Sequence, residues 1–257
     1  MWYDRGRTTK GDRALAPSNY HTHTRYCDGI DTPEELILEA IKLGCPAIGF
    51  TGHSYTPFDL SYCMTLENTE RYNREIPRLK EKYKGKINVL FGIEQDFFSP
   101  MPTDRYDYII GAVHYIEKDG AYLPIDDSRD RQIRDVEQYY GGDFYAYCED
   151  YYRLVGQVYE KTKCKIVAHL DLVTKFNEDG DLFDVSHPRY IAAADAAIEK
   201  LLPSPVTFEI NYGAVARGYR KTPYPDPRIV DTLTKRGARI IRTSDCHDKR
   251  FLLLGLE

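Results

Sequence analysis

The stretch Asp31–His53, DTPEELILEAIKLGCPAIGFTGH, joins a helix signal directly to a strand signal. Thr32 is the expected N-cap, a proline follows it at the first helical position, and Glu35 completes a T-x-x-E capping box. Apolar side chains then recur with helical spacing at Leu36, Ile37, Ala40, Ile41 and Leu43. Gly44 ends the helix, and the apolar run Ala47–Thr51 predicts a strand that leads straight to a histidine.

The same alternation of short apolar segments and longer amphipathic ones runs through the chain from Ser18. Strands are predicted at Ser18–Tyr20, Ala47–Thr51, Ile87–Gly92, Tyr108–Val113, Lys165–Ala168, Val206–Ile210 and Ala238–Thr243. Further helices are predicted at Glu67–Tyr83, Phe144–Lys161, Pro188–Leu201 and Pro227–Arg236. Seven strands with helices between them imply parallel connections in one closed sheet, so we expect a single α/β barrel over residues 18–257. Residues 1–17 lack periodicity and are expected to form a flexible N-terminal extension.

The composition limits the class of protein. The chain has 257 residues, 42% of them hydrophobic, and a formal net charge of −5. This excludes a disordered chain, and the mild acidity argues against nucleic acid as a partner. No apolar run approaches the roughly 18–20 residues that span a bilayer, so no membrane association is expected. The six cysteines form no C-x-x-C pair and no signal peptide is visible, which indicates reduced thiols in a cytoplasmic protein; the sequence gives no oligomeric state.

Residues of the types that commonly bind metals follow six of the predicted strands. They are His21 and His23, His53, Glu94, His114, His169, and the pair Asp245 and His247. Six of the seven histidines are in this set, and only His187 is not. In a parallel barrel the carboxyl ends of all strands meet on one face, where active sites are found. We therefore expect these eight residues to lie together.

A divalent metal centre explains this set better than a purely structural cluster of histidines. Imidazoles and carboxylates crowded on one face need positive charge to neutralise and order them, and imidazole nitrogen is a common metal ligand. Eight ligands are too many for one zinc ion, which takes four. The count fits two or three ions with a bridging carboxylate. Two ions close together suit in-line displacement at phosphorus, because they generate a hydroxide and stabilise charge on the reacting oxygens.

Other phosphatase motifs are missing from the sequence. Cys148 and Arg153 are one residue too close for a C-x5-R loop. Asp179 and Asp181 form a D-x-D pair in a polar loop that follows no apolar strand, so an aspartyl-phosphate mechanism is not expected. The same loop lacks the glycine and the final glutamate of an EF-hand and is expected to be a solvated turn. No P-loop, G-x-G-x-x-G or G-x-S-x-G motif is present.

Short motifs surround the expected ligands: HTHT at 21–24, TGH at 51–53, GIEQD at 92–96, AVH at 112–114, AHLDL at 168–172 and SDCH at 244–247. In residue type and order they resemble the PHP (polymerase and histidinol phosphatase) superfamily, over essentially all of residues 18–257. The segments CDGIDTPEELILEAIKLG, EINYGAVARGYRKTPYPDP and RTSDCH are similar to the histidinol-phosphatase branch.

The resemblance implies a distorted seven-stranded (β/α) barrel with its metal site at the carboxyl ends of the strands. It implies that one ion is held by His21, His23, Glu94 and Asp245. It implies that Glu94 also bridges to a second ion, held by His114 and His169, and that His53 and His247 belong to a third site. Many relatives have a further histidine in the loop after H-x-H; here Asp28 is near that position, either as a substitute oxygen ligand or as a plain turn residue.

The activity that the resemblance implies is hydrolysis of L-histidinol phosphate in histidine biosynthesis, by attack of a metal-bridging hydroxide on phosphorus. Zn, Mn and Fe all suit the mixed nitrogen and oxygen ligands. Glu94, Asp245 and His247 are the expected catalytic residues, with His247 or a nearby water assisting the leaving group. Arg217 and, less strongly, Arg25 are expected to bind the phosphate, because a guanidinium pairs well with phosphoryl oxygens.

Three alternatives remain open on the sequence. The first is a PHP phosphoesterase for a sugar phosphate, a nucleotide or phosphotyrosine. The second is an exonuclease, which the net negative charge disfavours. The third is a metal-stabilised binding module without turnover, which the intact set of ligands disfavours.

Overall fold

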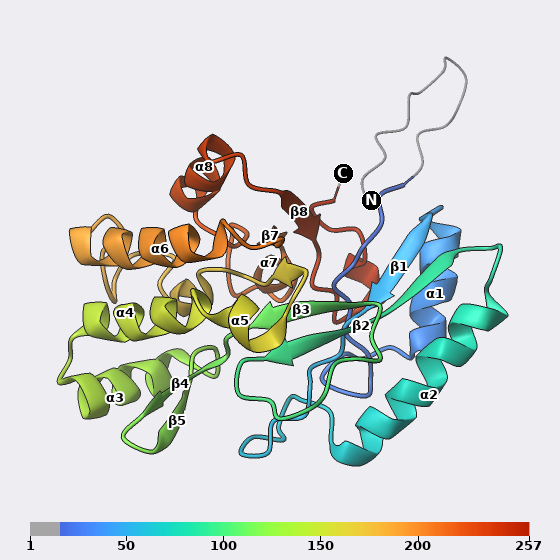
Figure 1. The fold of residues 1–257 in the computed structure, drawn as a ribbon, viewed down its shortest axis with the longest axis horizontal. Helices are drawn as coiled ribbons and strands as arrows, with labels where there is room; N and C mark the ends of the chain where they lie inside the picture. Colours follow the sequence, from blue (N-terminus) through green and yellow to red (C-terminus); the bar gives the residue numbers. More distant parts are fainter. Residues whose placement is uncertain (1–15, 257) are drawn as a thin grey trace.

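The computed structural model describes residues 16–256, so the expectation for residues 1–17 lies almost wholly outside the described residues. Its centre is a curled parallel sheet in the order β1-β2-β3-β6-β7-β8 (Figure 1). The strands are β1 (Ala47–Phe50), β2 (Asn88–Asp96), β3 (Tyr108–Ala112), β6 (Ile166–Val167), β7 (Thr207–Asn211) and β8 (Ile240–Thr243). This arrangement confirms the expected α/β class and a distorted barrel.

The first of the seven expected strands is not a regular strand. The segment 18–23 forms only isolated bridges, with Asn19 opposite Ile48 of β1 and Thr22 opposite Cys246 beyond β8. The amide of Thr51 donates to the carbonyl of Thr22 at 2.9 Å, and on the other side the His23 amide donates to the Cys246 carbonyl at 2.8 Å. The segment therefore occupies the seventh position between the two edges of the sheet, and these few bonds close the barrel.

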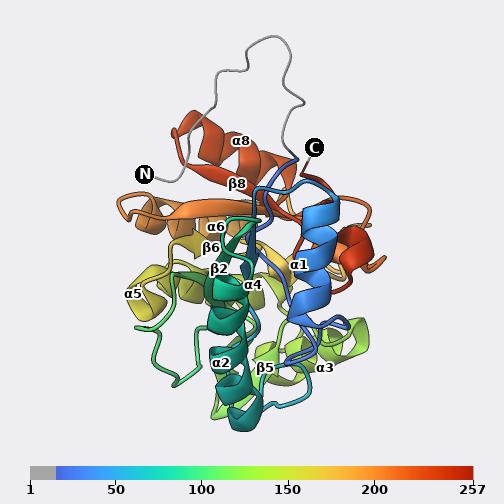
Figure 2. The same ribbon diagram turned by 90° about the vertical axis from the view of Figure 1, so that its right-hand side faces the viewer.

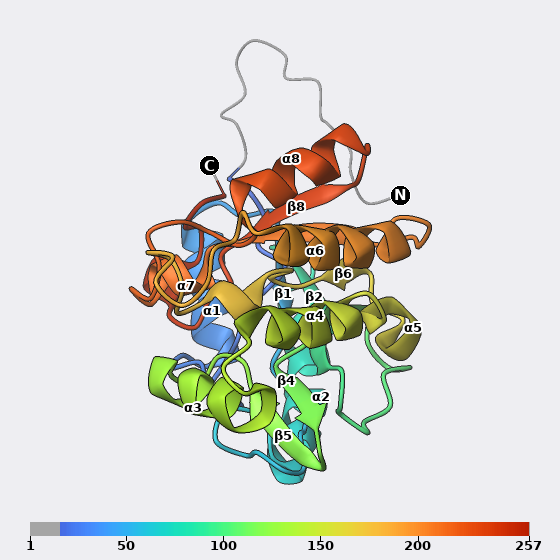
Figure 3. The same cartoon turned by 90° about the vertical axis from the view of Figure 1, so that its left-hand side faces the viewer.

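Helices cover the outside of the sheet. Helices α1 (Pro33–Lys42) and α2 (Leu66–Lys82) lie over β1 and β2 (Figure 2), and the capping box expected at Thr32 is present. On the opposite side lie α4 (Phe144–Val155), α6 (Pro188–Leu201) and α8 (Pro227–Lys235) (Figure 3). Short helices α5 (Val158–Thr162) and α7 (Gly213–Ala216) and two 3-10 turns, Leu172–Thr174 and Lys249–Phe251, complete this part of the chain. None of the described helices is long and apolar enough to cross a membrane.

The expectation of one helix over Phe144–Lys161 is wrong, because α4 ends at Val155 and α5 begins at Val158. Gly156 is the reason. A side chain there would lie 3.3 Å from the Cα of Ala197, since α6 packs closely against this point. Glycine also weakens a helix by about 1 kcal/mol relative to alanine, so the helix ends where the packing requires glycine.

A hairpin and a helix were not anticipated between β3 and α4. Strands β4 (Tyr115–Lys118) and β5 (Ala121–Pro124) pair antiparallel, and α3 (Arg129–Tyr140) follows them. Asp119 and Gly120 form the turn with φ of 50° and 80°, which is the pattern of a two-residue Asp-Gly hairpin. That dipeptide was the available sequence signal. The hairpin matters because it carries one wall of the cavity described below.

The interior of the barrel is apolar towards the amino ends of the strands and polar towards their carboxyl ends. Leu90, Tyr108, Ile110, Ile166 and Ala168 pack together in its lower part. The Tyr108 ring fills the space beside Gly92, where an added Cβ would lie 2.6 Å from the ring. Because side chains on a strand alternate, Glu94, two residues after Gly92, also points inward. It lies within β2 and not after it, because β2 stays paired with β3 as far as Asp96.

Candidate metal centre

Four ligand atoms from three parts of the barrel form a first group. They are Nε2 of His21, Nε2 of His23, Oε2 of Glu94 and Oδ1 of Asp245. The His23 nitrogen is 3.0 Å from the Asp245 oxygen, and the other nitrogen-to-oxygen distances in the group are 3.3–3.5 Å. The segment 18–23, β2 and the turn after β8 each contribute. The positive φ of Asp245, 46°, turns its carboxylate into this group.

The other oxygen of Glu94 belongs to a second group. Its Oε1 lies 3.1 Å from Nε2 of His169 and 3.5 Å from Nε2 of His114. Asp96 holds the far side of the His114 ring, with Nδ1 and the carboxylate 3.1 Å apart, and so directs Nε2 towards Glu94. Glu94 is 1% exposed and stands between the two groups, as the resemblance implies for a bridging ligand.

A third group contains Asp28. Its carboxylate lies 3.1 Å from Nε2 of His247 and 3.5 Å from Nε2 of His53. Both imidazoles lie close to His23, and the His247 ring stacks on it with centroids 4.1 Å apart. Burial alone would raise the pKa of Asp28, but the neighbouring imidazoles of His247 and His53 lower it well below its usual value. Of the two expectations for Asp28, the structure places its carboxylate with the ligands.

The residues fit divalent ions on a structural criterion. Among residues 16–256, fourteen buried side-chain nitrogen and oxygen atoms have no hydrogen-bond partner, and seven of them belong to these groups: Nε2 of His21, His23 and His247, Nδ1 of His53 and His169, Oε2 of Glu94 and Oδ1 of Asp245. Such atoms are rarely left unpaired in folded proteins. Ligands about 2.1 Å from one tetrahedral zinc ion lie roughly 3.4 Å apart, which matches the spacing in the first group. The unpaired atoms and their spacing therefore indicate ion sites.

Charge is balanced between these groups even without ions. The pKa values of Glu94 and Asp245 are held well below their usual range, because neighbouring imidazoles outweigh the effect of burial. Burial lowers the pKa of His21, yet Glu209, Asp245 and Glu94 together raise it well above 6.5. Burial and the adjacent His247 and His53 lower the pKa of His23 to about 3. Because a histidine must be unprotonated to bind a metal, an ion held by His21 would bind with release of a proton.

Residues 19–213 match the family model of the PHP domain. The chain belongs to the PHP domain family. The family membership expected from the sequence is confirmed, and the three groups contain the residues of the motifs that carried the resemblance.

Relatives of this PHP chain include the probable histidinol-phosphatase of Deinococcus radiodurans, 28% identical over 88% of this chain and 85% of the relative. The histidinol-phosphatase of Bacillus subtilis is 25% identical over 88% of this chain and 92% of its own. The HisK crystal structure from Listeria monocytogenes has a similar fold, with a TM-score of 0.79, 20% identity and coverage of 93% and 98% of the two chains. The histidinol phosphate phosphatase of Lactococcus lactis, solved with zinc, L-histidinol and phosphate, gives a TM-score of 0.64 at 20% identity, covering 92% of this chain and 88% of that one.

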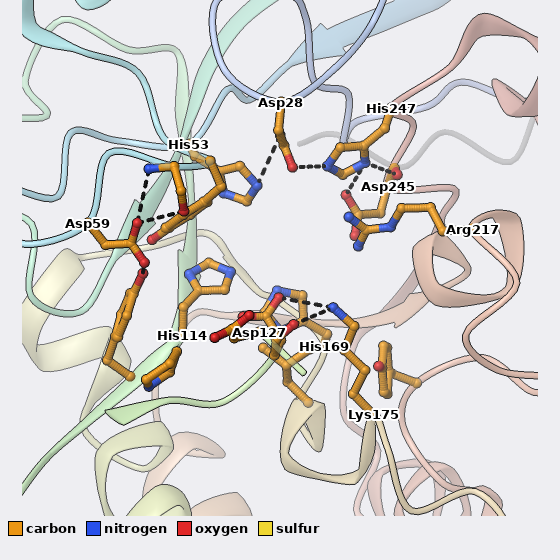
Figure 4. Close-up of a pocket in the computed structure, with 17 residues that line it drawn as sticks. Asp28, His53, Asp59, His114, Asp127, His169, Lys175, Arg217, Asp245 and His247 are labelled. Carbon is orange, nitrogen blue, oxygen red and sulfur yellow. Dashed lines mark hydrogen bonds and ion pairs between the residues drawn. The ribbon is translucent and has the colours of Figure 1, made fainter. Parts of the chain in front are cut away.

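A cavity of about 250 Å³ opens over these three groups. Its wall includes His53, His114, His169, Asp245 and His247 from the groups above, and side chains from the β4–β5 hairpin and the loops around it (Figure 4). A cavity of this size suits a small molecule more than a folded macromolecule. The three groups therefore face a space that can admit a small substrate.

Two cations reach this cavity. Arg217, expected from the sequence, lines it, and the carboxylates of Asp245, Asp28 and Asp126 raise its pKa against the lowering effect of burial. Lys175, which was not anticipated, also lines it; Nζ donates to the Asp126 carbonyl at 2.7 Å. Figure 4 shows both side chains directed into the cavity. No sequence feature distinguished Lys175, because it lies in a short 3-10 turn region rather than at a strand end.

The other expected cation is not brought into the cavity. Arg25 is exposed and does not line it, because the loop 24–31 folds back on itself through a bond from the Arg25 amide to the Asp31 carbonyl. Arg220, on the same loop as Arg217, turns away and donates to Thr174. Its neighbour Lys221 is exposed and pairs with Asp179 of the acidic loop, as a solvated turn would.

His187, the one histidine outside the expected set, has a structural role. It is the N-cap of α6, where Nδ1 accepts a hydrogen bond from the Arg189 amide, and it stacks on Tyr145. Glu209 is the functional residue that sequence analysis missed most clearly. It lies in the centre of β7 and its carboxylate contacts His21. A charged residue inside the apolar run VTFEIN was the sequence signal for it.

Proposed function

We propose that this PHP protein is a metal-dependent phosphomonoesterase that hydrolyses L-histidinol phosphate to L-histidinol and phosphate. The observation that carries this proposal is the position of Glu94, whose two oxygens belong to two adjacent ligand groups beneath a small cavity with Arg217 in its wall. The substrate is supported by the relatives that are histidinol-phosphatases and by the L-histidinol and phosphate in the Lactococcus lactis structure.

We propose two ions, held by the first and second groups, and a weaker third site at Asp28, His53 and His247. Divalent ions at these groups supply a nucleophile at neutral pH and neutralise the charge that develops on the phosphoryl oxygens. Zinc, manganese and iron suit the ligands, and the zinc in the Lactococcus lactis structure supports the first of these. Since all six cysteines are free in the structure, a cytoplasmic location is also part of the proposal.

The protein's own side chains orient the substrate. We propose that Arg217 binds two phosphoryl oxygens with its planar guanidinium, and that Lys175 adds a second positive charge from the neighbouring wall. Both reduce the charge of the dianion where it approaches the carboxylates. Where the third site holds no ion, His247 is the proposed proton donor to the leaving oxygen, because the residue lines the cavity and its Nε2 lies 3.1 Å from the Asp28 carboxylate. Glu94 and Asp245 are the proposed catalytic carboxylates that hold the ions.

Arg217→Ala is expected to raise KM for phosphomonoesters or lower kcat, with a combined loss in kcat/KM of about 10- to 100-fold. Hydrogen bonds to charged groups contribute about 1.5–3 kcal/mol, which corresponds to this range. The measurement is steady-state phosphate release by the metal-loaded protein. Lys221→Ala is the matched control, because Lys221 is close in sequence but its side chain is 83% exposed. Equal kinetics for the Arg217 variant and this control would remove Arg217 from the site.

The proposed function is tested by phosphate release from a panel of phosphomonoesters after loading with Mn²⁺ or Zn²⁺. The panel contains histidinol phosphate, a sugar phosphate, a nucleotide and a phosphotyrosyl peptide. The expected result is the highest kcat/KM for histidinol phosphate. A preference for another member would keep the chemistry and change the substrate. Release from none of them would leave a non-catalytic module, and digestion of DNA ends would indicate an exonuclease.

A further inference from the structure

Glu209 lies inside the barrel but in none of the three ligand groups. It comes from the middle of β7 and is 1% exposed. A buried carboxylate is costly unless several donors satisfy it. Four donors do so here, two on each oxygen, and each oxygen serves a different ligand group.

Oxygen Oε1 of Glu209 fixes a ligand of the first group. It lies 2.6 Å from Nδ1 of His21 and accepts a bond from Oγ1 of Thr243, also at 2.6 Å. A carboxylate on Nδ1 keeps the proton on that nitrogen and leaves Nε2 free as a ligand atom. Nε2 is the His21 atom that lies 3.3 Å from Glu94 and has no hydrogen-bond partner among the described residues.

Oxygen Oε2 of Glu209 fixes a ligand of the second group. It accepts the backbone amide of His169 at 2.9 Å, just where β6 ends and the His169 side chain turns towards Glu94. It also accepts Nδ2 of Asn211 at 2.9 Å. The same Asn211 nitrogen lies 3.2 Å from Oδ2 of Asp245, and Oδ1 of Asn211 accepts a hydrogen bond from the Gly213 amide. These bonds fix the orientation of the Asn211 side chain. Through Asn211, Glu209 therefore also supports Asp245.

We propose that Glu209 is a positioning residue that couples the first and second ion groups, so that its loss weakens binding at both. The inference rests on the proposed function for the assignment of the two groups. Its physical basis is that one carboxylate accepts from His21 on one side and from His169 and Asn211 on the other. A carboxylate accepts on both oxygens and donates on neither, which no other side chain of this length does.

The test is Glu209→Gln, read out by metal affinity. Glutamine keeps the shape of the side chain, but its NH2 group replaces one of the two oxygens and then faces the two donors of that oxygen. The contact with His21 or the contact with the His169 amide is therefore lost, and that residue is displaced. Metal-free protein is titrated with Zn²⁺ against a chromophoric chelator, which resolves the successive affinities. Changes in the partners of metal ligands typically cost about 10- to 100-fold in affinity. We expect a loss of about this size in both of the tightest binding steps.

Two other variants define the comparison. Asp96→Asn alters the support of His114 alone, so it is expected to weaken one step and leave the other. Thr243→Val removes a donor from Glu209 without changing a ligand contact, so it is expected to leave both affinities near those of the unaltered protein. Glu209→Asp keeps the carboxylate and is expected to recover part of the loss. If Glu209→Gln fails to fold, as judged by circular dichroism of the metal-free protein, Glu209→Asp becomes the test of the inference. We then expect an intermediate loss of Zn²⁺ affinity in both binding steps.

Unchanged Zn²⁺ affinities in Glu209→Gln would overturn the inference, and loss of only one step would overturn the coupling. An equal loss in Thr243→Val would also overturn it, because any buried hydrogen bond would then have the same effect. A failure of the proposed function can be distinguished from a failure of this inference. If the unaltered protein binds Zn²⁺ in two tight steps but releases no phosphate from any substrate, the activity is wrong while the role of Glu209 is still measured.

Discussion

Glu94→Gln is expected to lower kcat/KM for histidinol phosphate by roughly a thousandfold and to reduce the bound metal to less than half. The two oxygens of Glu94 lie within 3.5 Å of ligand nitrogens in both the first and the second group. Glutamine offers one neutral oxygen and one NH2 group, so it cannot serve both. A metal ion contributes several kcal/mol to the transition state, and about 4 kcal/mol corresponds to a thousandfold in rate.

The measurements for this variant are steady-state phosphate release and metal content by mass spectrometry after dialysis. Glu117→Gln is the matched control, because it makes the same chemical change at an exposed position on β4. It is expected to keep both activity and metal. A Glu94 variant that keeps two ions per chain and an activity within about tenfold of the unaltered protein would show that Glu94 does not join the two groups.

Removal of the ions with a chelator is expected to abolish phosphate release and to lower the unfolding temperature by about 10 °C. A ligand that binds only the folded state at 1,000 times its dissociation constant stabilises that state by about 4 kcal/mol. For a chain of this length, each kcal/mol changes the unfolding temperature by about 2–4 °C. Differential scanning calorimetry before and after reloading with Mn²⁺ or Zn²⁺ measures the change.

The Glu94→Gln protein is the internal control for chelation. Because it is expected to hold little metal, the chelator should change its unfolding temperature much less. Should both proteins lose the same stability, the chelator acts on something other than the centre around Glu94. Should neither lose stability nor activity, the unpaired buried atoms of His21, His23 and Asp245 have another explanation than bound ions.

The closeness of the eight expected ligands could be predicted from the sequence because their positions follow local rules. Residues such as His53 and His114 come directly after apolar runs, and the ends of parallel strands converge on one face. The chain order of strands and helices therefore placed the eight residues together without any knowledge of distances. Asp28 is different. Its distance from His53 and His247 depends on the loop that carries it, and only the structure decided between a turn residue and a neighbour of the ligands.

Contacts between distant residues could not be predicted in the same way. Glu209 is 188 residues from His21 and depends on the pairing of β7 with β8 and on the closure of the barrel. Lys175 enters the cavity because a 3-10 turn follows β6, and no periodic pattern announces such a turn. The β4–β5 hairpin did have a local sign in Asp119 and Gly120, but its strands are short and lie outside the main sheet.

The isolated bridges of the segment 18–23 hold the first part of the barrel to the last by few backbone bonds, and the first ligand group lies at this join. This segment carries His21 and His23, whereas Asp245 follows the last strand, so the group joins the first and last parts of the barrel. An ion held there would act as a removable cross-link between His21 and Asp245, which are 224 positions apart in the sequence. Closing so long a loop costs entropy, which the ion–ligand bonds would offset. The join made by isolated bridges is thus the one that such an ion would fasten, and metal availability would then favour a tightly closed barrel.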